Sequence, residues 1–234
     1  MAFERDAPKA ARPLNFTLDQ HTGNSMRIAV IGASKGIGYE LLKMALEQGH
    51  EVTALLRNPS KLSISNSRLK IVKGDILDAA SATAVTSGQD AVCVCIGIPP
   101  TRKPVNVFSR GVQRVLAAMD RGSHQKLIAV TGIGAGDSKG HGGFFYDRLI
   151  NPLLLGTIYA DKDRQESIIK ASDVEWLIVR PGFLTNGPRT GKYRAIENLS
   201  GVTAGKISRA DVADFILKQL TKPTHFRKTP LLTY

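Results

Sequence analysis

The chain has 234 residues, of which 42% are hydrophobic and 22% charged, and a formal net charge of +12. This length suits one domain with a sizeable core. No apolar run approaches the ~20 residues of a membrane-spanning helix, and no continuous apolar stretch near the start resembles a secretion signal. We therefore expect a cytoplasmic protein without a membrane partner. The basic residues are dispersed along the chain, which argues against nucleic acid and favours a small phosphorylated cofactor as the anionic partner.

The cysteines and histidines give no sign of a metal site. Cys93 and Cys95 lie two positions apart in an apolar run, and the five histidines are scattered. On a strand the two cysteines would face the same side without the geometry for a mutual disulfide. We predict two buried free thiols in a reducing compartment, and no metal.

Residues 1–25 carry balanced charges, two prolines and no periodic apolar pattern, so they are predicted to form an N-terminal tail. Residues 26–234 are predicted to form the folded domain. Its last part, 183–234, is too short for a separate substrate domain and is expected to contribute to a small substrate pocket.

Strands and helices alternate along the folded part. Strands are predicted at 28–31, 51–56, 69–72, 90–96, 126–131, 174–179 and 230–232. Helices are predicted from Gly38 to Gly49 and at 78–87, 105–121, 144–171 and 208–220. The fourth helix is expected to break near Asn151 and Pro152, with Gly156 as a second candidate position. Ser208 is expected to cap the last helix, with Asp211 three residues on. This alternation predicts an α/β fold, a single Rossmann-type doubly wound parallel sheet with helices on both faces.

The first strand runs into a turn with three glycines, Gly32, Gly36 and Gly38, followed by a helix. This context is typical of a dinucleotide site, because small residues let backbone N–H groups approach a pyrophosphate at the helix N-terminus. The alternative is a strand–helix corner that needs glycine only for packing.

Ligands of such sheets bind beyond the carboxyl ends of the strands. The residues predicted to contact a cofactor there are Gly32, Ser34, Lys35, Gly36, Ile37, Gly38, Arg57, Asp75, Ile76, Gly97, Ile98, Thr131, Lys162, Pro181, Gly182, Phe183 and Leu184.

The residue after the second strand indicates which cofactor is preferred. An acid there would bind the ribose 2′-hydroxyl of NAD, whereas an arginine accommodates a 2′-phosphate. Arg57 stands at this position, Lys35 adds a second positive charge, and the only acid of the strand, Glu51, is at its far end. We predict NADP(H) in preference to NAD(H). A solvated surface arginine is the alternative for Arg57.

The glycine turn, Gly74-Asp75 and Arg180-Pro181-Gly182 resemble motifs of the short-chain dehydrogenase/reductase superfamily. The stretch Leu55-Leu56-Arg57-Asn58-Pro59, the Lys162…Glu166 spacing and the short C-terminal part are more similar to its atypical branch, which includes NmrA-like proteins and flavin/biliverdin reductases. The resemblance covers about residues 26–220. It implies an NADPH-dependent oxidoreductase that transfers a hydride to a small organic substrate of carbonyl, quinone, flavin or tetrapyrrole type. The alternative is a non-catalytic NADP(H)-binding sensor or assembly factor of the NmrA-like type.

The family's catalytic pattern is a serine, then a tyrosine with a lysine four residues later. Thr131 stands at the hydroxyl position, and Tyr159 precedes Lys162 by three residues rather than four. Residues three apart still share a helix face, so we expect Lys162 to contact the cofactor and Tyr159 to donate a proton. Tyr159 as a packing residue is the alternative, and Tyr146 is a further candidate that lacks a lysine four residues on.

The glycine-rich stretch 132–143 is predicted to be a gate over the site, with a mobile surface loop as the alternative. Phe144, Phe145 and Phe183 are candidates for the wall of an apolar substrate pocket, or for core residues. A homodimer is one of the assemblies that the sequence leaves open.

Overall fold

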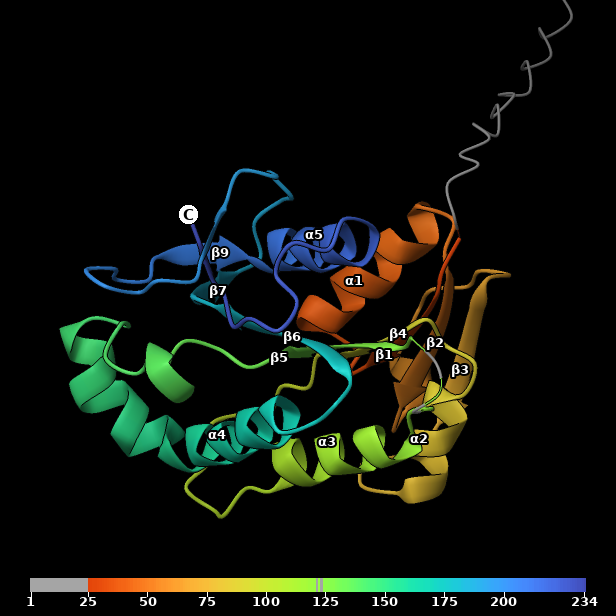
Figure 1. The fold of residues 1–234 in the computed structure, drawn as a ribbon, viewed down its shortest axis with the longest axis horizontal. Coiled ribbons are helices and arrows are strands. Elements are labelled where there is room, and N and C mark those ends of the chain that lie inside the picture. Colours follow the sequence, from red (N-terminus) through yellow and green to blue (C-terminus); the bar gives the residue numbers. More distant parts are fainter. Residues whose placement is uncertain (1–24, 121, 123) are drawn as a thin grey trace, which may run out of the picture.

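The computed structural model describes residues 25–120, 122 and 124–234, so the predicted tail lies outside the described residues except for Ser25. A central sheet separates two helical layers (Figure 1). One layer contains α1 (Gly36–Glu47) and α5 (Arg209–Thr221), and the other contains α2 (Ala79–Thr86), α3 (Val107–Ala118) and α4 (Gly156–Lys170).

The sheet has eight strands in the order β3-β2-β1-β4-β5-β6-β10-β8, with only β8 antiparallel to its neighbour. This architecture confirms the predicted α/β class. The strands are β1 (Arg27–Ile31), β2 (Glu51–Leu56), β3 (Leu69–Lys73), β4 (Ala91–Val94), β5 (Lys126–Val130), β6 (Glu175–Pro181), β8 (Arg194–Ile196) and β10 (Leu231–Thr233). A separate short parallel pair joins β7 (Phe183–Thr185) to β9 (Lys206–Ser208).

The register aligns the strand ends. One transverse row across the sheet consists of Val72, Leu55, Ile31, Val94, Ala129 and Ile178. Because all six strands run in the same direction, the loops that follow them emerge along one edge, which is where ligands of such sheets bind.

The central strands are buried on both faces. In β1, Ile28 and Val30 join the core cluster that includes α1 and α5, whereas Ala29 and Ile31 join the cluster that includes α2 and α3. Their apolar side chains leave water completely or almost so, which explains why the strand is apolar throughout rather than alternating. Cys93 and Cys95 are free and buried in the first of these clusters, as predicted.

The helix predicted at 144–171 is instead two elements. A π-helix, η3 (Tyr146–Leu155), contains Pro152 and runs into α4 at Gly156, so the change of geometry comes four residues after the proline. A proline ring clashes with the carbonyl four residues back in an α-helix. The wider π turn, with bonds from residue i to i+5, relieves that clash without a break.

The remaining short helices are η1 (Pro59–Lys61) and η2 (Gly136–Ser138). Within the described residues, none of the helices combines the length and the apolar character that crossing a bilayer requires.

The start of α5 differs from a capping box in one respect. The Ser208 hydroxyl accepts the N–H of Asp211, as predicted. The Asp211 carboxylate does not return a bond to Ser208, because it accepts from Thr190, Gly191 and the hydroxyl of Tyr234. It thereby ties the loop before β8 and the end of the chain to α5.

The start of α3 is capped by a residue of another helix. Asn106, which precedes α3, makes no capping bond with its side chain. The buried carboxylate of Asp161 on α4 instead accepts the backbone N–H groups of Phe108, at 2.8 Å, and Ser109, at 3.4 Å, and the Ser109 hydroxyl. A negative charge at a helix N-terminus is favourable, so this contact fixes α4 against α3.

We expect Asp161→Ala to lower the free energy of unfolding by about 2–4 kcal/mol, because three buried donors lose their acceptor. Urea unfolding followed by circular dichroism measures this. Asp173→Ala is the matched control, since Asp173 is exposed and its loss is expected to change stability by less than about 0.5 kcal/mol. Equal stabilities of the two variants would contradict the capping role.

Candidate functional site

The glycine turn after β1 excludes side chains at two positions. A Cβ on Gly32, where φ is +93°, would lie 2.7 Å from the carbonyl oxygen of Cys95, and one on Gly38 would lie 2.4 Å from the oxygen of Gly32. The turn therefore packs tightly against the loop after β4, and α1 packs closely against β1. These are two of the roles that glycines have in dinucleotide-binding turns.

The N-terminus of α1 is open to an anion. Lys35, which precedes the helix, makes no capping bond with its side chain, and the first turn contains no acidic residue. The first N–H groups of a helix have no partner within it, and the helix dipole adds about half a positive charge there. Such an end binds phosphate.

Arg209 adds a positive charge that sequence reasoning missed. Its Nε lies 3.8 Å from the position of a Cβ on Gly36, and its Nη1 donates to Asn186 at 2.7 Å. The only local signal is an arginine in the first turn of α5, where the helix dipole disfavours a cation. Because Arg209 lies beside the N-terminus of α1, its guanidinium group and the helix dipole would attract the same anion.

The predicted side chains after β2 and β3 have different surroundings. Arg57 is exposed and makes no hydrogen bond or ion pair within the described part of the chain, two residues after Leu55, which pairs with Ile31. The carboxylate of Asp75 accepts the N–H of Leu77 at 2.9 Å and so shapes its own turn. Arg57 therefore stands free at the strand end adjacent to the glycine turn.

Two predicted cofactor residues have side chains in the core. Ile37 and Ile76 are 7% and 5% exposed, and Ile76 lies against Gly111 of α3. Only the backbone atoms of these two residues could therefore contact a cofactor. By contrast, Gly97 and Ile98 lie in the loop after β4, and a Cβ on Gly97 would meet no atom within 4 Å.

The loop after β6 contacts the C-terminal segment. The N–H of Gly182 donates to the carbonyl oxygen of Leu232 at 2.9 Å, and a Cβ on Gly182 would lie 2.4 Å from the oxygen of Gly205. The carbonyl of Pro181 accepts the N–H of Ile133 at 3.1 Å. Leu184, which follows, is 37% exposed.

A buried ion pair between Arg180 and Glu166 connects β6 to α4, and Asp137 of the glycine-rich loop also pairs with Arg180. Nε of the fully buried Arg180 donates to Glu166 at 3.0 Å, its Nη2 donates to the other oxygen of the same carboxylate, and its Nη1 donates to Asp137. The Thr131 hydroxyl donates to Glu166 at 2.8 Å. The proton of Thr131 is therefore committed to Glu166, so in this arrangement Thr131 positions Glu166 and does not donate to a substrate.

Lys162 lies beside this pair. Its Nζ donates to the carbonyl of Thr131 and lies 5.3 Å from the ring centroids of both Phe108 and Tyr159. Burial lowers the pKa of the Lys162 ammonium to about 8, and the Glu166 carboxylate opposes this shift. The group therefore changes charge near pH 8, well below an ordinary lysine.

Tyr159 and Lys162 face the same point despite their spacing. The Tyr159 hydroxyl oxygen and Lys162 Nζ lie 3.0 and 3.8 Å from the position of a Cβ on Gly132. The Tyr146 oxygen lies 3.0 Å from both the Tyr159 oxygen and the carbonyl oxygen of Ile133. Burial raises the pKa of both phenols. The helix thus presents the tyrosine and the lysine together, with a phenol that is a weaker acid than usual.

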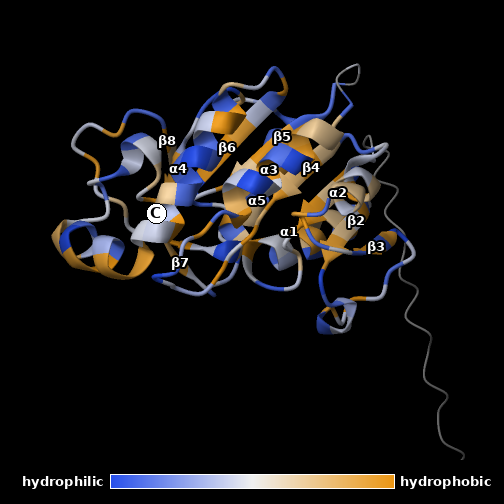
Figure 2. Ribbon diagram, turned by 90° about the horizontal axis from the view of Figure 1, so that it is seen from below, coloured by the Kyte–Doolittle hydropathy of each residue, from blue (hydrophilic) through white to orange (hydrophobic). Residues whose placement is uncertain are grey.

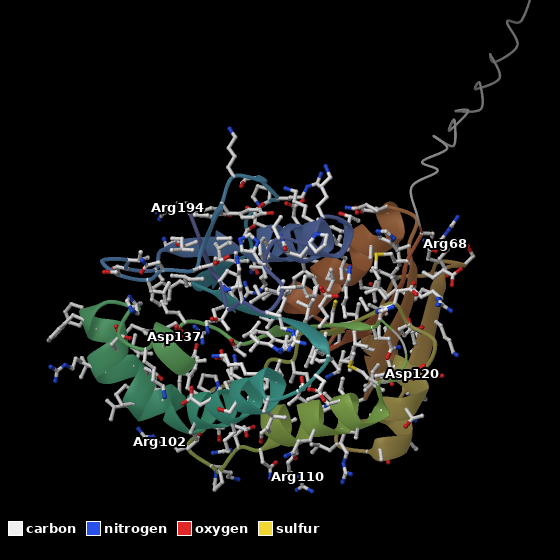
Figure 3. All side chains as sticks on the ribbon, in the orientation of Figure 1. Arg68, Arg102, Arg110, Asp120, Asp137 and Arg194 are labelled. Atoms are coloured by element: carbon white, nitrogen blue, oxygen red, sulfur yellow. The ribbon has the colours of Figure 1, made fainter. Side chains whose placement is uncertain are left out.

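The glycine-rich loop 132–143 is held in place at several points. The N–H of Gly136 donates to Asp163 at 2.7 Å, Lys139 pairs with Asp163, and Asp137 pairs with Arg180 (Figure 3). Residues 131–135 and Ser138 are buried. These contacts describe a loop that packs on α4 and β6, and its role as a gate stays a prediction.

The three candidate wall aromatics separate into two groups. Phe183 packs edge-to-face on Tyr146, with ring centroids 5.2 Å apart. Phe144 and Phe145 contact each other at 5.8 Å and are each 72% exposed. Only Phe183 therefore lies beside the tyrosine pair.

A cavity of about 280 Å³ lies beside Tyr159. One carboxylate oxygen of Asp147, a lining residue, is buried without a hydrogen-bond partner in the described structure. The volume is near the lower limit for a small-molecule pocket. The residues that line it are Lys139, Gly140, Asp147, Asn151, Pro152, Gly156, Tyr159, Ala160 and Asp163.

Comparisons with known proteins agree with this geometry. A family model described as NAD(P)H-binding matches residues 32–223. The protein YwnB of Bacillus subtilis is 27% identical over 217 residues, which cover 86% of this chain and 94% of YwnB. ChuY of Escherichia coli O157:H7, an anaerobillin reductase, superposes with a TM-score of 0.72 at 23% identity, over 88% of this chain and 96% of ChuY. A short-chain dehydrogenase/reductase of Veillonella parvula in complex with NADP gives a TM-score of 0.71 at 16% identity, over 89% and 94% of the two chains.

The low pKa of Lys162 predicts a pH-dependent affinity for NADPH. As pH rises from 7 to 9, through a pKa of about 8, the ammonium loses its charge, and binding of the anionic cofactor is expected to weaken by up to about tenfold. An ordinary lysine, with a pKa near 10.4, would stay charged over this range.

Fluorescence titration of NADPH at several pH values measures the effect. The control is Lys162→Met, which should bind more weakly at pH 7 and show a flatter profile. A dissociation constant of the unmodified protein that stays constant from pH 7 to 9 would contradict the prediction.

Proposed function

The chain belongs to the NAD(P)H-binding family, and on this premise we propose that it is an NADPH-dependent oxidoreductase that transfers a hydride to a small organic acceptor. The observation that carries the proposal is the meeting of the Tyr159 hydroxyl and the Lys162 ammonium at Gly132, beyond the carboxyl end of β5. A protein that only bound a dinucleotide would need the glycine turn and Lys162 but not the Tyr159 hydroxyl beside them.

The residues present fit a dinucleotide. Side chains are excluded at Gly32 and Gly38 by contacts below 3 Å, which leaves backbone N–H groups at the open end of α1 to bind the pyrophosphate. Lys162 would contact the nicotinamide ribose. When bound, the nicotinamide supplies the hydride, and the protein supplies position and any proton.

The proposed preference for NADPH over NADH depends on two basic side chains, one after β2 and one in the glycine turn. Arg57 is exposed and unpaired within the described residues, and Lys35 is exposed in the glycine turn. Charge-assisted hydrogen bonds contribute about 1.5–3 kcal/mol, which corresponds to roughly ten- to hundredfold in affinity. Arg209, close to Gly36, would strengthen binding of both cofactors, because it lies at the pyrophosphate end rather than after β2.

The acidity of the Tyr159 phenol indicates which class of hydride acceptor suits the site. Burial raises the pKa of its phenol, and a general acid works best with a pKa near the working pH. Acceptors that need no proton in the hydride step, such as a flavin or a quinone, suit this site better than an aldehyde. The similarity to ChuY, an anaerobillin reductase, supports a reductase whose acceptor has an extended conjugated system.

A sensor without turnover is the second candidate. It is favoured by one observation, the commitment of the Thr131 hydroxyl to Glu166 at 2.8 Å, since a proton donor must be free to reach its substrate. Measurements of NADPH oxidation distinguish the oxidoreductase from the sensor.

Arg57→Ala tests the cofactor preference. We expect the unmodified protein to bind NADPH at least about tenfold more tightly than NADH, and the variant to lose most of this difference with little change for NADH. Calorimetric titration gives the four dissociation constants. Lys61→Ala, which removes another exposed basic residue shortly after β2, is the control and should keep the preference. Equal affinities of the unmodified protein for both cofactors would refute it.

NADPH oxidation with flavins, quinones, biliverdin and aldehydes as acceptors tests the reaction itself. For a flavin or quinone, Tyr159→Phe should leave turnover within about threefold, whereas an aldehyde reduction that uses the phenol should fall by roughly 10²–10⁴. Lys162→Ala should weaken NADPH binding and turnover together.

Two results would count against the proposal. Tight NADPH binding without oxidation by any acceptor class would favour the sensor. Full turnover and unchanged NADPH affinity in Lys162→Ala would remove the lysine from the site.

A further inference from the structure

One short segment exposes six large apolar side chains, which we call the apolar patch. It lies on η3 and the two residues before it. Its members are Phe144 (72% exposed), Phe145 (72%), Leu149 (49%), Ile150 (44%), Leu153 (56%) and Leu154 (45%). The other large apolar residues exposed in the described chain are at least six positions apart in the sequence, Ile71, Leu77, Leu184 and Tyr234. Scattered apolar residues on a surface are ordinary, whereas a contiguous group marks an interaction site.

The geometry of η3 gathers these side chains. In a π-helix, residues four or five apart lie on the same side, so Leu149 follows Phe145, and Leu153 and Leu154 follow Leu149, along one side of the helix. Of η3, only Tyr146 is buried. The helix lies at one extremity of the molecule, away from the sheet, and its ribbon is largely hydrophobic (left in Figure 2). The patch is therefore a protruding surface rather than a groove.

The charges around the patch are mainly positive. Arg148 lies within η3 and is exposed. Arg102 donates from Nε to the carbonyl of Leu153 at 3.2 Å, which brings the exposed pair Arg102 and Lys103 to the edge of the patch (Figure 3). None of these three cations has an ion pair within the described residues. The one acid of η3, Asp147, is half-buried and lines the cavity beside Tyr159.

We propose that the apolar patch binds the surface of an anionic lipid bilayer, with Phe145, Leu149 and Leu153 in the headgroup region and Arg102, Lys103 and Arg148 on the lipid phosphates. A helix that carries Phe and Leu on one side with basic residues beside them is the pattern of interfacial membrane binding. Basic residues near an anionic leaflet add attraction that salt screens. The chain's net charge of +12 acts in the same direction.

A second copy of this chain fits the patch less well. A twofold interface brings the same surface of each copy together. The Arg102, Lys103 and Arg148 side chains of both copies would then crowd around one contact, and like charges at an interface are unfavourable. The positive charge around the apolar patch therefore favours an anionic partner.

The proposal revises one expectation from the sequence. The absence of a long apolar run led us to expect no membrane partner, but peripheral binding needs only a few exposed apolar residues and nearby cations. It is independent of the proposed reaction, since lipid binding can be measured without any cofactor.

Flotation of the full chain with vesicles tests it. We expect binding to vesicles of phosphatidylglycerol and phosphatidylcholine, and at least tenfold weaker binding to phosphatidylcholine alone. The double variant Phe145→Ser/Leu153→Ser and the single variant Arg148→Glu should each reduce partitioning to the anionic vesicles several-fold or more. Ile71→Ser, at a 39% exposed apolar residue of β3, is the matched control and should bind as the unmodified protein does.

Three outcomes would overturn the proposal. The first is no flotation with anionic vesicles. The second is flotation that the double variant leaves unchanged, since general attraction by the net positive charge would then suffice. The third is a dimer, measured by light scattering without lipid, that the double variant converts to a monomer, because the patch would then be an interface between copies. Circular dichroism checks that all variants are folded.

Discussion

The carboxyl edge of β5 and β6 depends on the buried ion pair between Arg180 and Glu166. Taking two charges out of water costs several kcal/mol each, so the pair is tolerable only when further hydrogen bonds satisfy both partners. Here Thr131 donates to Glu166, and Asp137 accepts from Arg180. Because the four residues come from β6, α4 and the segment between β5 and η3, the same bonds that satisfy the charges also fix these segments. Removing Glu166 would leave the buried Arg180 with Asp137 as its acidic partner, and removing Arg180 would leave the buried Glu166 with Lys170, 3.6 Å away.

Much of the fold followed from local patterns in the sequence. Apolar strands, the glycine turn and helical spacing predicted the parallel sheet and the edge at which its loops meet, because each pattern depends on neighbouring residues. Arg180 was assigned to a motif after β6, but its partner Glu166 belongs to another element, and no spacing rule connects the two. The same limit applies to Arg209, which approaches Gly36 only because α5 packs beside α1. Asp161 was not singled out either, because Phe108, whose N–H group it accepts, lies 53 residues before it.

The errors at η3 have a different origin. Sequence reasoning treated Asn151 and Pro152 as a break in an α-helix, but the chain widened into a π-helix that accommodates the proline. A change from 3.6 residues per turn alters which side chains face inward, so helical periodicity could not place the apolar residues of this segment. Phe144 and Phe145, which were expected in a pocket wall or the core, are consequently at the surface, whereas Tyr146 next to them is buried.

One side of η3 contributes to the candidate site at Tyr159, and the other side carries the apolar patch. On the inner side the Tyr146 hydroxyl contacts Tyr159 and the carbonyl of Ile133, and its ring packs on Phe183. On the outer side lie Phe145 and Leu149, one residue before and three residues after Tyr146. If the outer side rests on a bilayer, as proposed, the side of the same helix that carries Tyr146 contacts Tyr159 of the candidate site. Of the two acceptors proposed to need no proton from the phenol, only a quinone also dissolves in lipid, so a quinone is the acceptor that the two proposals together favour.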